Sequence, residues 1–204
     1  MTERGAFIAF EGGEGSGKST QAALLATRRD ALLTREPGGT VVGERVRGIF
    51  LDPVVGHVDP WAEVLLMAAA RAQHVADVIE PALAAGRDVV TDRFTGSSLA
   101  YQGHGRGLPV QDVARISTFA THGTEPDVVV LLDVSAETGA SRLGSSPDRM
   151  ESAGLDFHRR VVAAYDHLAA EDPLRWVVLD ATKPPEEVHG GVMAALESLL
   201  VPVP

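Results

Sequence analysis

The chain of 204 residues contains no cysteine. This absence excludes disulfide bonds, thiolate nucleophiles and cysteine-rich zinc sites, and it is typical of a reducing compartment. No apolar run approaches the roughly 20 residues that a membrane-spanning helix needs, since the longest runs are as short as residues 128–132. The first residues, Met1-Thr2-Glu3-Arg4, lack the basic and apolar regions of a signal peptide. We therefore expect a soluble, cytoplasmic protein without a membrane partner.

Positive charge is also scarce, and the formal net charge at pH 7 is -10. A non-specific polynucleotide binder would normally display a basic face that neutralises many phosphates, so we expect no nucleic-acid partner. A small phosphorylated ligand is compatible with this charge, because a few arginines and a metal ion can bind it locally.

Lysine is rare, and one of the two lysines completes a motif. Residues 12–19, Gly-Gly-Glu-Gly-Ser-Gly-Lys-Ser, match the pattern of a phosphate-binding loop, with an apolar run before them and a helix-compatible run after them. Backbone amides and the helix N-terminus would hold a polyphosphate, Lys18 would reach its outer phosphates, and Ser19 would bind Mg²⁺. The alternative is a glycine-rich turn with a surface lysine. We disfavour it because the chain has only two lysines, Lys18 and Lys183, among its 18 basic residues, so a lysine at the motif position is not expected by accident.

Apolar runs and helical patterns alternate along the chain, and 45% of its residues are hydrophobic. This predicts an α/β fold in which helices cover both faces of a five-stranded parallel sheet, as one domain over residues 1–204. The predicted strands are residues 6–10, 31–34, 88–91, 127–133 and 176–179. The predicted helices are residues 19–29, 40–50, a long helix from Pro60 kinked near Pro81, and 110–120, 135–143, 155–171 and 185–200. Residues 102–107 are predicted to be a glycine-rich loop.

Charged residues follow two of the predicted strands. Asp92 and Arg93 lie after strand 88–91, and Asp133 ends strand 127–133. Ligands of open parallel sheets bind at the carboxyl ends of the strands, so both aspartates are candidates for holding a metal ion. The alternative for Asp92 and Arg93 is a surface ion pair.

The phosphate-binding loop alone is compatible with a motor, a switch, a transporter subunit or a kinase. No Asn-Lys-x-Asp motif for guanine is present, and the length is that of a small-metabolite kinase. Four further segments narrow the choice: Thr-Arg-Glu-Pro-Gly-Gly-Thr (34–40), Ala-x-Arg-Ala-Gln-His (69–74), Asp-Arg-Phe-x-x-Ser-Ser-Leu-Ala-Tyr-Gln-Gly (92–103) and Leu-Asp-Val-Ser (132–135). With Phe-Glu-Gly-x-Glu-Gly-Ser-Gly-Lys-Ser (10–19), they make the chain resemble bacterial thymidylate kinases.

The resemblance implies a three-layer P-loop kinase fold with strand order 2-3-1-4-5. It also implies that the ATP γ-phosphoryl group passes to thymidine monophosphate (dTMP), giving the diphosphate in dTTP synthesis, with Mg²⁺ and in a homodimer. The implied ATP-binding residues are Gly12, Gly13, Glu14, Gly15, Ser16, Gly17, Lys18, Ser19, Thr20 and Arg142. The implied substrate-binding residues are Glu14, Arg35, Glu36, Arg47, Met67, Arg71, Arg93, Ser97, Ser98, Tyr101 and Gln102.

Within these sets the resemblance assigns roles. Arg93 would bind the acceptor phosphate, and Glu14 would lie near the sugar 3′-hydroxyl. Arg35, Glu36 and Arg47 would lie near the acceptor, Arg71 and Ser98 would hydrogen-bond thymine, and Tyr101 and Gln102 would border the sugar and base. Met67 stands where the family usually has a phenylalanine that stacks on thymine. For several of these positions the alternative is ordinary surface or helix packing.

For the metal, the resemblance favours Asp92 with Ser19, through a metal-bound water, and makes Asp133 a structural partner of the loop. Gly15 leaves no arginine in the loop. Family members of this kind place arginines in a mobile lid, here about residues 142–154. We therefore predict that Arg149 closes over the phosphates as a catalytic residue beside Lys18, Arg93 and Glu14, and that Arg142 lies against the adenine or its phosphates. The alternative is that both form exposed ion pairs with Asp148 and Glu151.

Two other functions stay open at this point. One is phosphorylation of another nucleoside monophosphate. The other is nucleotide binding without catalysis, suggested by Met67 and by a lid with few arginines, although Lys18, Asp92 and Arg93 argue against it.

Overall fold

The computed structural model describes residues 4–200. Its five strands form a parallel sheet in the order β2-β3-β1-β4-β5, as predicted. The strands are β1 (Phe7–Glu11), β2 (Leu32–Arg35), β3 (Val89–Asp92), β4 (Val128–Asp133) and β5 (Trp176–Asp180), each within one residue of its predicted bounds. The order places β1 between β3 and β4, so the carboxyl ends that carry Asp92 and Asp133 flank the segment after β1.

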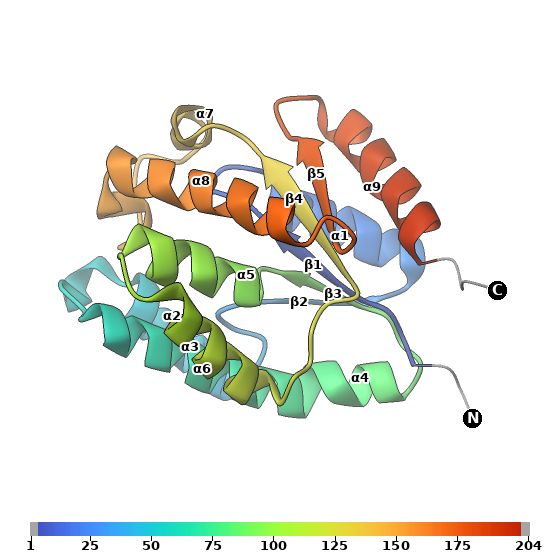
Figure 1. Cartoon of the computed structure of the whole chain (residues 1–204), viewed down its shortest axis with the longest axis horizontal. Coiled ribbons are helices and arrows are strands. Elements are labelled where there is room, and N and C mark those ends of the chain that lie inside the picture. Colours follow the sequence, from blue (N-terminus) through green and yellow to red (C-terminus); the bar gives the residue numbers. More distant parts are fainter. Residues whose placement is uncertain (1–3, 201–204) are drawn as a thin grey trace.

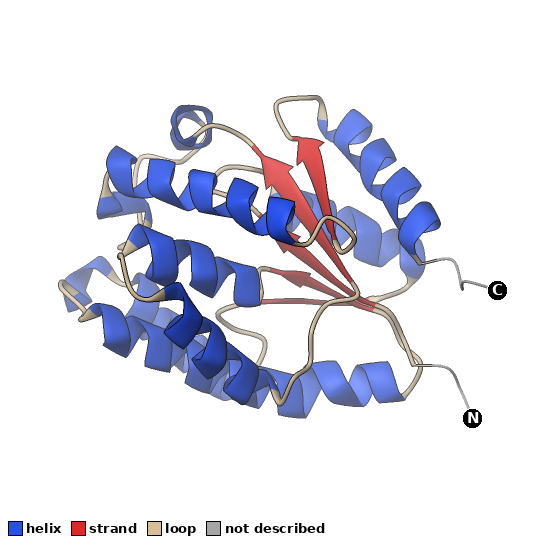
Figure 2. Ribbon diagram, viewed as in Figure 1, coloured by secondary structure: helices blue, strands red, loops and turns tan. Residues whose placement is uncertain are grey.

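Helices cover both faces of this sheet (Figures 1 and 2). They are α1 (Lys18–Arg29), α2 (Val41–Leu51), α3 (Pro60–His74), α4 (Glu80–Ala84), α5 (Thr95–Ser98), α6 (Val110–Thr121), α7 (Ala136–Ser141), α8 (Leu155–Glu171) and α9 (Pro185–Leu199), with short 3-10 helices at Pro53–Val55 and Glu151–Ala153. Helices α1 and α9 lie on one face, and α8 and the α3 to α6 region lie on the other. Among residues 4–200, no helix has both the length and the apolarity to cross a bilayer.

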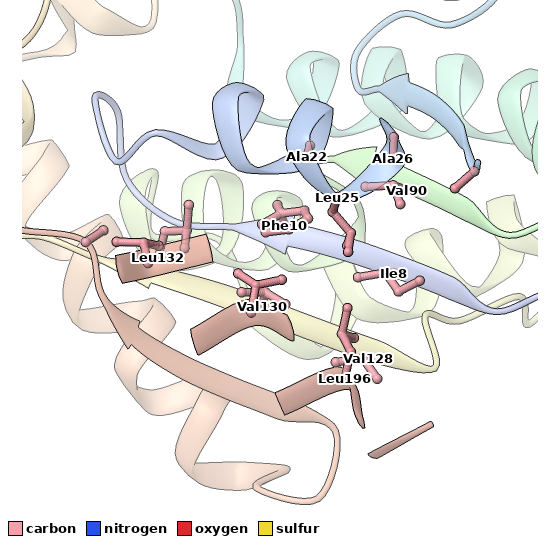
Figure 3. Close-up of a cluster of buried hydrophobic side chains, with 14 of the residues drawn as sticks. Ile8, Phe10, Ala22, Leu25, Ala26, Val90, Val128, Val130, Leu132 and Leu196 are labelled. Carbon is pink, nitrogen blue, oxygen red and sulfur yellow. The ribbon is translucent and has the colours of Figure 1, made fainter. Parts of the chain in front are cut away.

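Side chains of β1 point alternately to the two faces of the sheet, so this one strand contributes to the cores on both faces. Ile8 and Phe10 pack with Leu25 of α1 and Leu196 of α9, which Figure 3 shows, whereas Phe7 belongs to the cluster on the opposite face. Successive side chains of a strand point to opposite faces, so a strand buried on both sides is apolar throughout. The continuous apolar runs in the sequence have this cause.

The predicted glycine-rich loop at residues 102–107 is wrong for most of its length. The backbone from Leu99 to Gly105 forms wide π-helical turns that continue α5. A Cβ atom on Gly105 would lie 2.7 Å from the Phe157 ring of α8, so this glycine allows close helix packing. Glycine is needed here because a neighbouring helix packs closely, and not because the chain turns. Such π-helical turns are often found at functional sites.

The long helix from Pro60 changes its winding before Pro81. A π-helical turn over Val75–Ile79 links α3 to α4, and Pro81 stands in the first turn of α4. Proline removes one backbone donor and clashes with the preceding turn of an α-helix, and the wider turn accommodates both effects. The predicted kink therefore takes the form of a local change in helix type.

Candidate active site

The segment between β1 and α1 forms a loop at the N-terminus of α1. Gly17, the residue before the helix, has φ of 90°, a left-handed value that favours glycine. Lys18 is buried, and its Nζ donates to the Gly13 carbonyl at 2.7 Å and to Ser16 Oγ at 3.2 Å. Burial and the nearby charge of Arg93 lower the pKa of Lys18 to about 8. The loop thus holds an ammonium group against its own backbone, as a polyphosphate site requires.

The contact with α7 explains why position 15 of this loop is glycine. Gly15 has φ of 66°, and a Cβ atom there would lie 2.3 Å from the backbone oxygen of Gly139. An arginine at position 15 would need α7 to move. Lys18 is therefore the one cation of the loop, and any arginine that stabilises the transferring phosphate must come from outside it.

Asp92 and Ser19 meet beside the loop. Strand pairing sets Asp92 of β3 opposite Phe10 of β1, and Ser19 Oγ donates to Asp92 Oδ2 at 2.5 Å. Asp92 Oδ1 is buried and has no hydrogen-bond partner within residues 4–200. A carboxylate and a hydroxyl suit Mg²⁺, which takes few protein ligands beside phosphates and water. The described part of the chain contains no cluster of three or more His, Cys, Asp or Glu ligands.

Asp133, the alternative metal ligand, lies at the end of β4 on the other side of β1. No hydrogen bond between its carboxylate and the phosphate-binding loop occurs in the described residues, so the expected structural contact is not made. Asp92 is the carboxylate that touches the hydroxyl of Ser19.

Arg93 occupies a strained backbone position directly after Asp92. Its φ is 73°, a left-handed value that costs a non-glycine residue about 1–3 kcal/mol. Its amide donates to the Phe10 carbonyl at 2.9 Å, which ties it to β1. This conformation turns the side chain toward the loop, where Nη1 donates to Gly12 O at 3.3 Å and to Ser97 Oγ at 3.2 Å.

The other end of the Arg93 fork forms a triangle with two residues. Nη2 lies 2.8 Å from Glu14 Oε1 and 3.0 Å from Tyr101 Oη, and Tyr101 donates to the same carboxylate oxygen at 2.7 Å. Burial raises the pKa of Glu14, but the charges of Arg93 and Lys18 and the Tyr101 hydrogen bond lower it to about 2. Glu14 is thus an anion between two cations.

Glu11, the last residue of β1, is a site residue that the sequence interpretation missed. Its buried carboxylate accepts from Phe94 N at 2.9 Å, Ser97 N at 3.0 Å, Ser97 Oγ at 2.6 Å and Tyr165 Oη at 2.9 Å. Burial raises its pKa. These contacts fix the segment that follows Arg93. The available signal was a glutamate at the end of an apolar strand, where burial is expensive unless hydrogen bonds compensate it.

Two hollows meet at this site. The first, which we call the acceptor cavity, has a volume of about 90 Å³, and the second, the phosphate hollow, about 300 Å³. The acceptor cavity is lined by Glu14, Glu36, Pro37, Arg47, Phe50, Leu51, Met67, Arg93, Ser97, Tyr101, Gln102, Asp148 and Met150. The phosphate hollow is lined by Glu14, Gly15, Gly17, Lys18, Ser19, Thr20, Arg35, Glu36, Arg47, Asp92, Arg93, Asp148 and Glu151. The two hollows adjoin, because they share five lining residues: Glu14, Glu36, Arg47, Arg93 and Asp148.

Most predicted substrate-binding residues therefore lie together, and two lie behind the wall. Arg71 is buried, and it donates to Glu36 Oε2 at 2.7 Å and to Ser98 Oγ at 3.0 Å. The opposite oxygen of Glu36 contacts His74 Nδ1 at 3.0 Å, and His74 Nε2 contacts Thr34 Oγ1 at 2.6 Å. Arg71 and Ser98 thus adjoin the acceptor cavity through Glu36 without lining it. Sequence interpretation missed His74, and it missed Pro37, Phe50, Leu51, Asp148 and Met150 in the wall.

The two lid arginines have different partners. Arg142 Nη1 donates to the carbonyl of Gly15 at 3.2 Å and to that of Ala181 at 3.0 Å, beside the loop. Arg149 instead donates from Nη1 to Glu63 at 2.6 Å and from Nε to the Phe50 carbonyl at 2.8 Å.

The ion pairs with Asp148 and Glu151, considered as the alternative, are not formed by either arginine. The predicted closure of Arg149 over the phosphates is not seen in this conformation. Arg149 is partly buried against α2 and α3 because Glu63 supplies a carboxylate there and Phe50 a ring, whose centroid lies 5.1 Å from Cζ.

Comparison with known proteins gives one consistent result. The family model described as thymidylate kinase matches residues 10–192. The thymidylate kinase of Pelotomaculum thermopropionicum is 48% identical over 205 residues, covering 97% of this chain and 95% of that protein. That of Chromobacterium violaceum is 46% identical over 205 residues, covering 97% and 96%. The crystal structure of thymidylate kinase from Ehrlichia chaffeensis superposes with a TM-score of 0.76 at 30% identity, covering 95% of this chain and 99% of that one.

Proposed function

The chain belongs to the thymidylate kinase family, and on that premise we propose which residues carry its reaction. The reaction is transfer of a phosphoryl group to dTMP, which gives the diphosphate. The observation that carries the assignment is that Glu14 and Arg93 line both the phosphate hollow and the acceptor cavity. A donor phosphate on the loop and an acceptor phosphate on Arg93 would then be neighbours.

In this proposal the loop amides and Lys18 hold the donor phosphates of ATP, and Arg93 holds the acceptor phosphate. The fork of Arg93 fixes the line of attack, because Nη2 stays on Glu14 while Nη1, which contacts only neutral groups, faces the phosphate. Glu14 and Tyr101 hold Arg93 in place from the side of the sugar. Arg35 and Arg47 add positive charge at the rim of the phosphate hollow.

We propose that Ser19 and Asp92 hold Mg²⁺, since their oxygens meet and one buried carboxylate oxygen has no partner within the described residues. When bound, the ion neutralises charge on the donor phosphates. The chain's own contribution is to place the carboxylate beside the loop through the pairing of β3 with β1.

We propose that Arg149 leaves Glu63 and reaches the phosphates when both substrates are bound. Two features favour this movement. Glu63 is shared with a second arginine, Arg106, and Arg149 Nη2 is buried without a hydrogen-bond partner in residues 4–200. When Arg149 separates from Glu63, the Glu63 carboxylate therefore still has Arg106 as an ion-pair partner.

We further propose a cytoplasmic homodimer that associates through α3 and α6. These two helices pack together, and they expose Leu65 (58% exposed) and Phe119 (82% exposed). Exposed large apolar side chains of neighbouring helices are typical of an interface. Sedimentation of the protein and of Phe119→Ser would test this: dissociation of the variant supports the assignment, and a monomeric wild type overturns it.

The experiment that tests the function is ADP release from ATP with thymidylate, deoxyuridylate, uridylate or no acceptor. We expect the fastest release with thymidylate and almost none without an acceptor. Equal turnover with all three acceptors would indicate a broader monophosphate kinase, and hydrolysis without an acceptor would contradict a kinase.

A further inference from the structure

Glu63 of α3 joins three segments behind the acceptor cavity. It is 0% exposed, and each of its two carboxylate oxygens accepts two hydrogen bonds. Oε1 accepts from Arg106 Nη2 at 2.9 Å and from Arg149 Nη1 at 2.6 Å. Oε2 accepts from Arg106 Nε at 3.1 Å and from Gln102 Nε2 at 3.3 Å. The residue lines neither hollow, so no substrate contact explains it.

The contact with Gln102 fixes which end of its amide faces Glu63. A carboxylate held between two guanidinium groups offers only acceptors, so it accepts from the NH₂ group of Gln102 and repels the amide oxygen. Gln102 is buried and lines the acceptor cavity. Its Oε1 makes no hydrogen bond with the described part of the chain, and one hydrogen of Nε2 is also left over.

This orientation matters for a pyrimidine base. Thymine carries a hydrogen on ring N3, so that atom needs an acceptor opposite it. Cytosine has an unprotonated N3, which needs a donor. An amide presents one or the other according to which way it is turned, so its orientation can distinguish the two rings at N3, in addition to their differences at C4 and in the 5-methyl group of thymine.

We propose that Glu63 is a positioning residue that sets the choice of base: by holding Nε2 of Gln102, it aims Oε1 at a ring N–H. The inference rests on the proposed placement of the acceptor in this cavity. Arg106 keeps the carboxylate in place, with its Cζ 4.7 Å from the centroid of the Phe157 ring. The amide is thus oriented through a rigid chain of contacts that reaches from α8 to α3.

The test is the ratio of kcat/KM for thymidylate to kcat/KM for deoxycytidylate, measured with ATP for the wild type and for Glu63→Gln. In the variant, position 63 can donate as well as accept, so the Gln102 amide can turn over. We expect the ratio to fall about tenfold or more, through a higher KM for thymidylate and a gain with deoxycytidylate. An unchanged ratio in a folded variant overturns the proposal.

Glu63→Asp covers the case in which Glu63→Gln does not fold. Aspartate keeps a charge for the arginines but is too short to hold Gln102, so the ratio should again fall, although less. An Asp variant that folds and keeps the wild-type ratio counts against the proposal.

Arg149→Lys is the matched control, since it changes another partner of Glu63 and leaves the contact with Gln102 in place. Its turnover is expected to fall while its ratio stays at the wild-type value. A ratio that drops equally in this variant would show that general disorder around Glu63 sets selectivity, and would overturn the proposal. If the wild type itself shows no thymidylate-dependent ADP release, the proposed function fails rather than the role of Glu63.

Discussion

Glu14 Oε1 and Arg93 Nη2 lie 2.8 Å apart, so the arginine at the junction of the two hollows already has a carboxylate partner. The pair is largely buried, with side-chain exposures of 22% for Glu14 and 15% for Arg93. Arg93 has a second terminal nitrogen that contacts only neutral groups, namely Gly12 O and two hydroxyls. An acceptor phosphate can therefore be bound while Glu14 keeps the guanidinium in position.

Arg93→Lys should lower kcat/KM for thymidylate by roughly 10²–10³, because lysine keeps the charge but cannot bind both Glu14 and a phosphate with a rigid fork. Steady-state kinetics with saturating ATP would measure it. Arg4→Lys is the control, since Arg4 pairs with Asp127 at the surface and lines neither hollow, so this variant should be unaffected. A loss below threefold at position 93 would remove Arg93 from the proposed mechanism.

The ion pair between Glu14 and Arg93 should also make the stability of the protein depend on pH. The pKa of Glu14 is lowered to about 2 in the folded protein from an ordinary value of 4.5, so its stabilisation is complete above pH 4.5 and is lost as the pH falls toward 2. Glu14→Gln lacks this stabilisation. We expect the stability gap between wild type and variant to narrow by roughly 1 kcal/mol between pH 6 and pH 3.5 in urea unfolding. A gap that stays constant over this range would show that Glu14 is not held as an anion.

The five strands were predictable because buried parallel strands need continuous apolar runs, and the five runs are short and well separated. Their order was predicted from the resemblance to thymidylate kinases and not from the runs themselves. Residues that line the phosphate hollow were also predictable where a motif names them, as with Lys18, Asp92 and Arg93. The contacts of Glu11 and Glu63 were not predictable. Each glutamate is a lone acid in an apolar segment, and its partners lie far along the chain, as with Tyr165 for Glu11 and Arg149 for Glu63.

The glycines at positions 103 and 105 misled the prediction for the same reason. Glycine in sequence indicates either a turn or a close contact, and only the position of a neighbouring helix distinguishes the two. For Gly105 that neighbour is Phe157 of α8, more than 50 residues later. The prediction for Arg149 had a similar limit, because no residue near Arg149 in the sequence indicates that its partner is Glu63.

The two candidate carboxylates for the metal can be separated by one titration. Asp92→Asn removes the charge that meets Ser19, so we expect the Mg²⁺ concentration for half-maximal activity to rise about tenfold or more. Asp133→Asn is the matched control and should change it less than threefold, because Asp133 makes no hydrogen bond with the loop in the described residues. The reverse order of effects would assign the metal to Asp133.

Substitution of the two lid arginines, Arg142 and Arg149, should change different kinetic constants. Arg149→Ala is expected to lower kcat by about 10² or more if the side chain reaches the transferring phosphate, and to change thymidylate affinity much less. Arg142→Ala should mainly raise the KM for ATP, because Arg142 holds the Gly15 carbonyl beside the loop. Turnover that survives the loss of Arg149 but not that of Arg142 would assign the transition-state charge to Arg142.

Met67 is the wall residue that departs from the family pattern, and it lies with Phe50 in the same cavity wall. Since Met67 is 4% exposed, Met67→Ala removes a buried side chain and should cost about 2–5 kcal/mol of stability. It should also raise the KM for thymidylate about tenfold, because the base loses an apolar contact. Met193→Ala on α9 is the control: it removes the same type of side chain, which is partly buried against the core on the other face of the sheet. Stability should fall there while the KM stays unchanged. Equal KM values in the two variants would mean that the base does not touch Met67, and that Phe50 and the other apolar residues of the wall provide the surface for the ring.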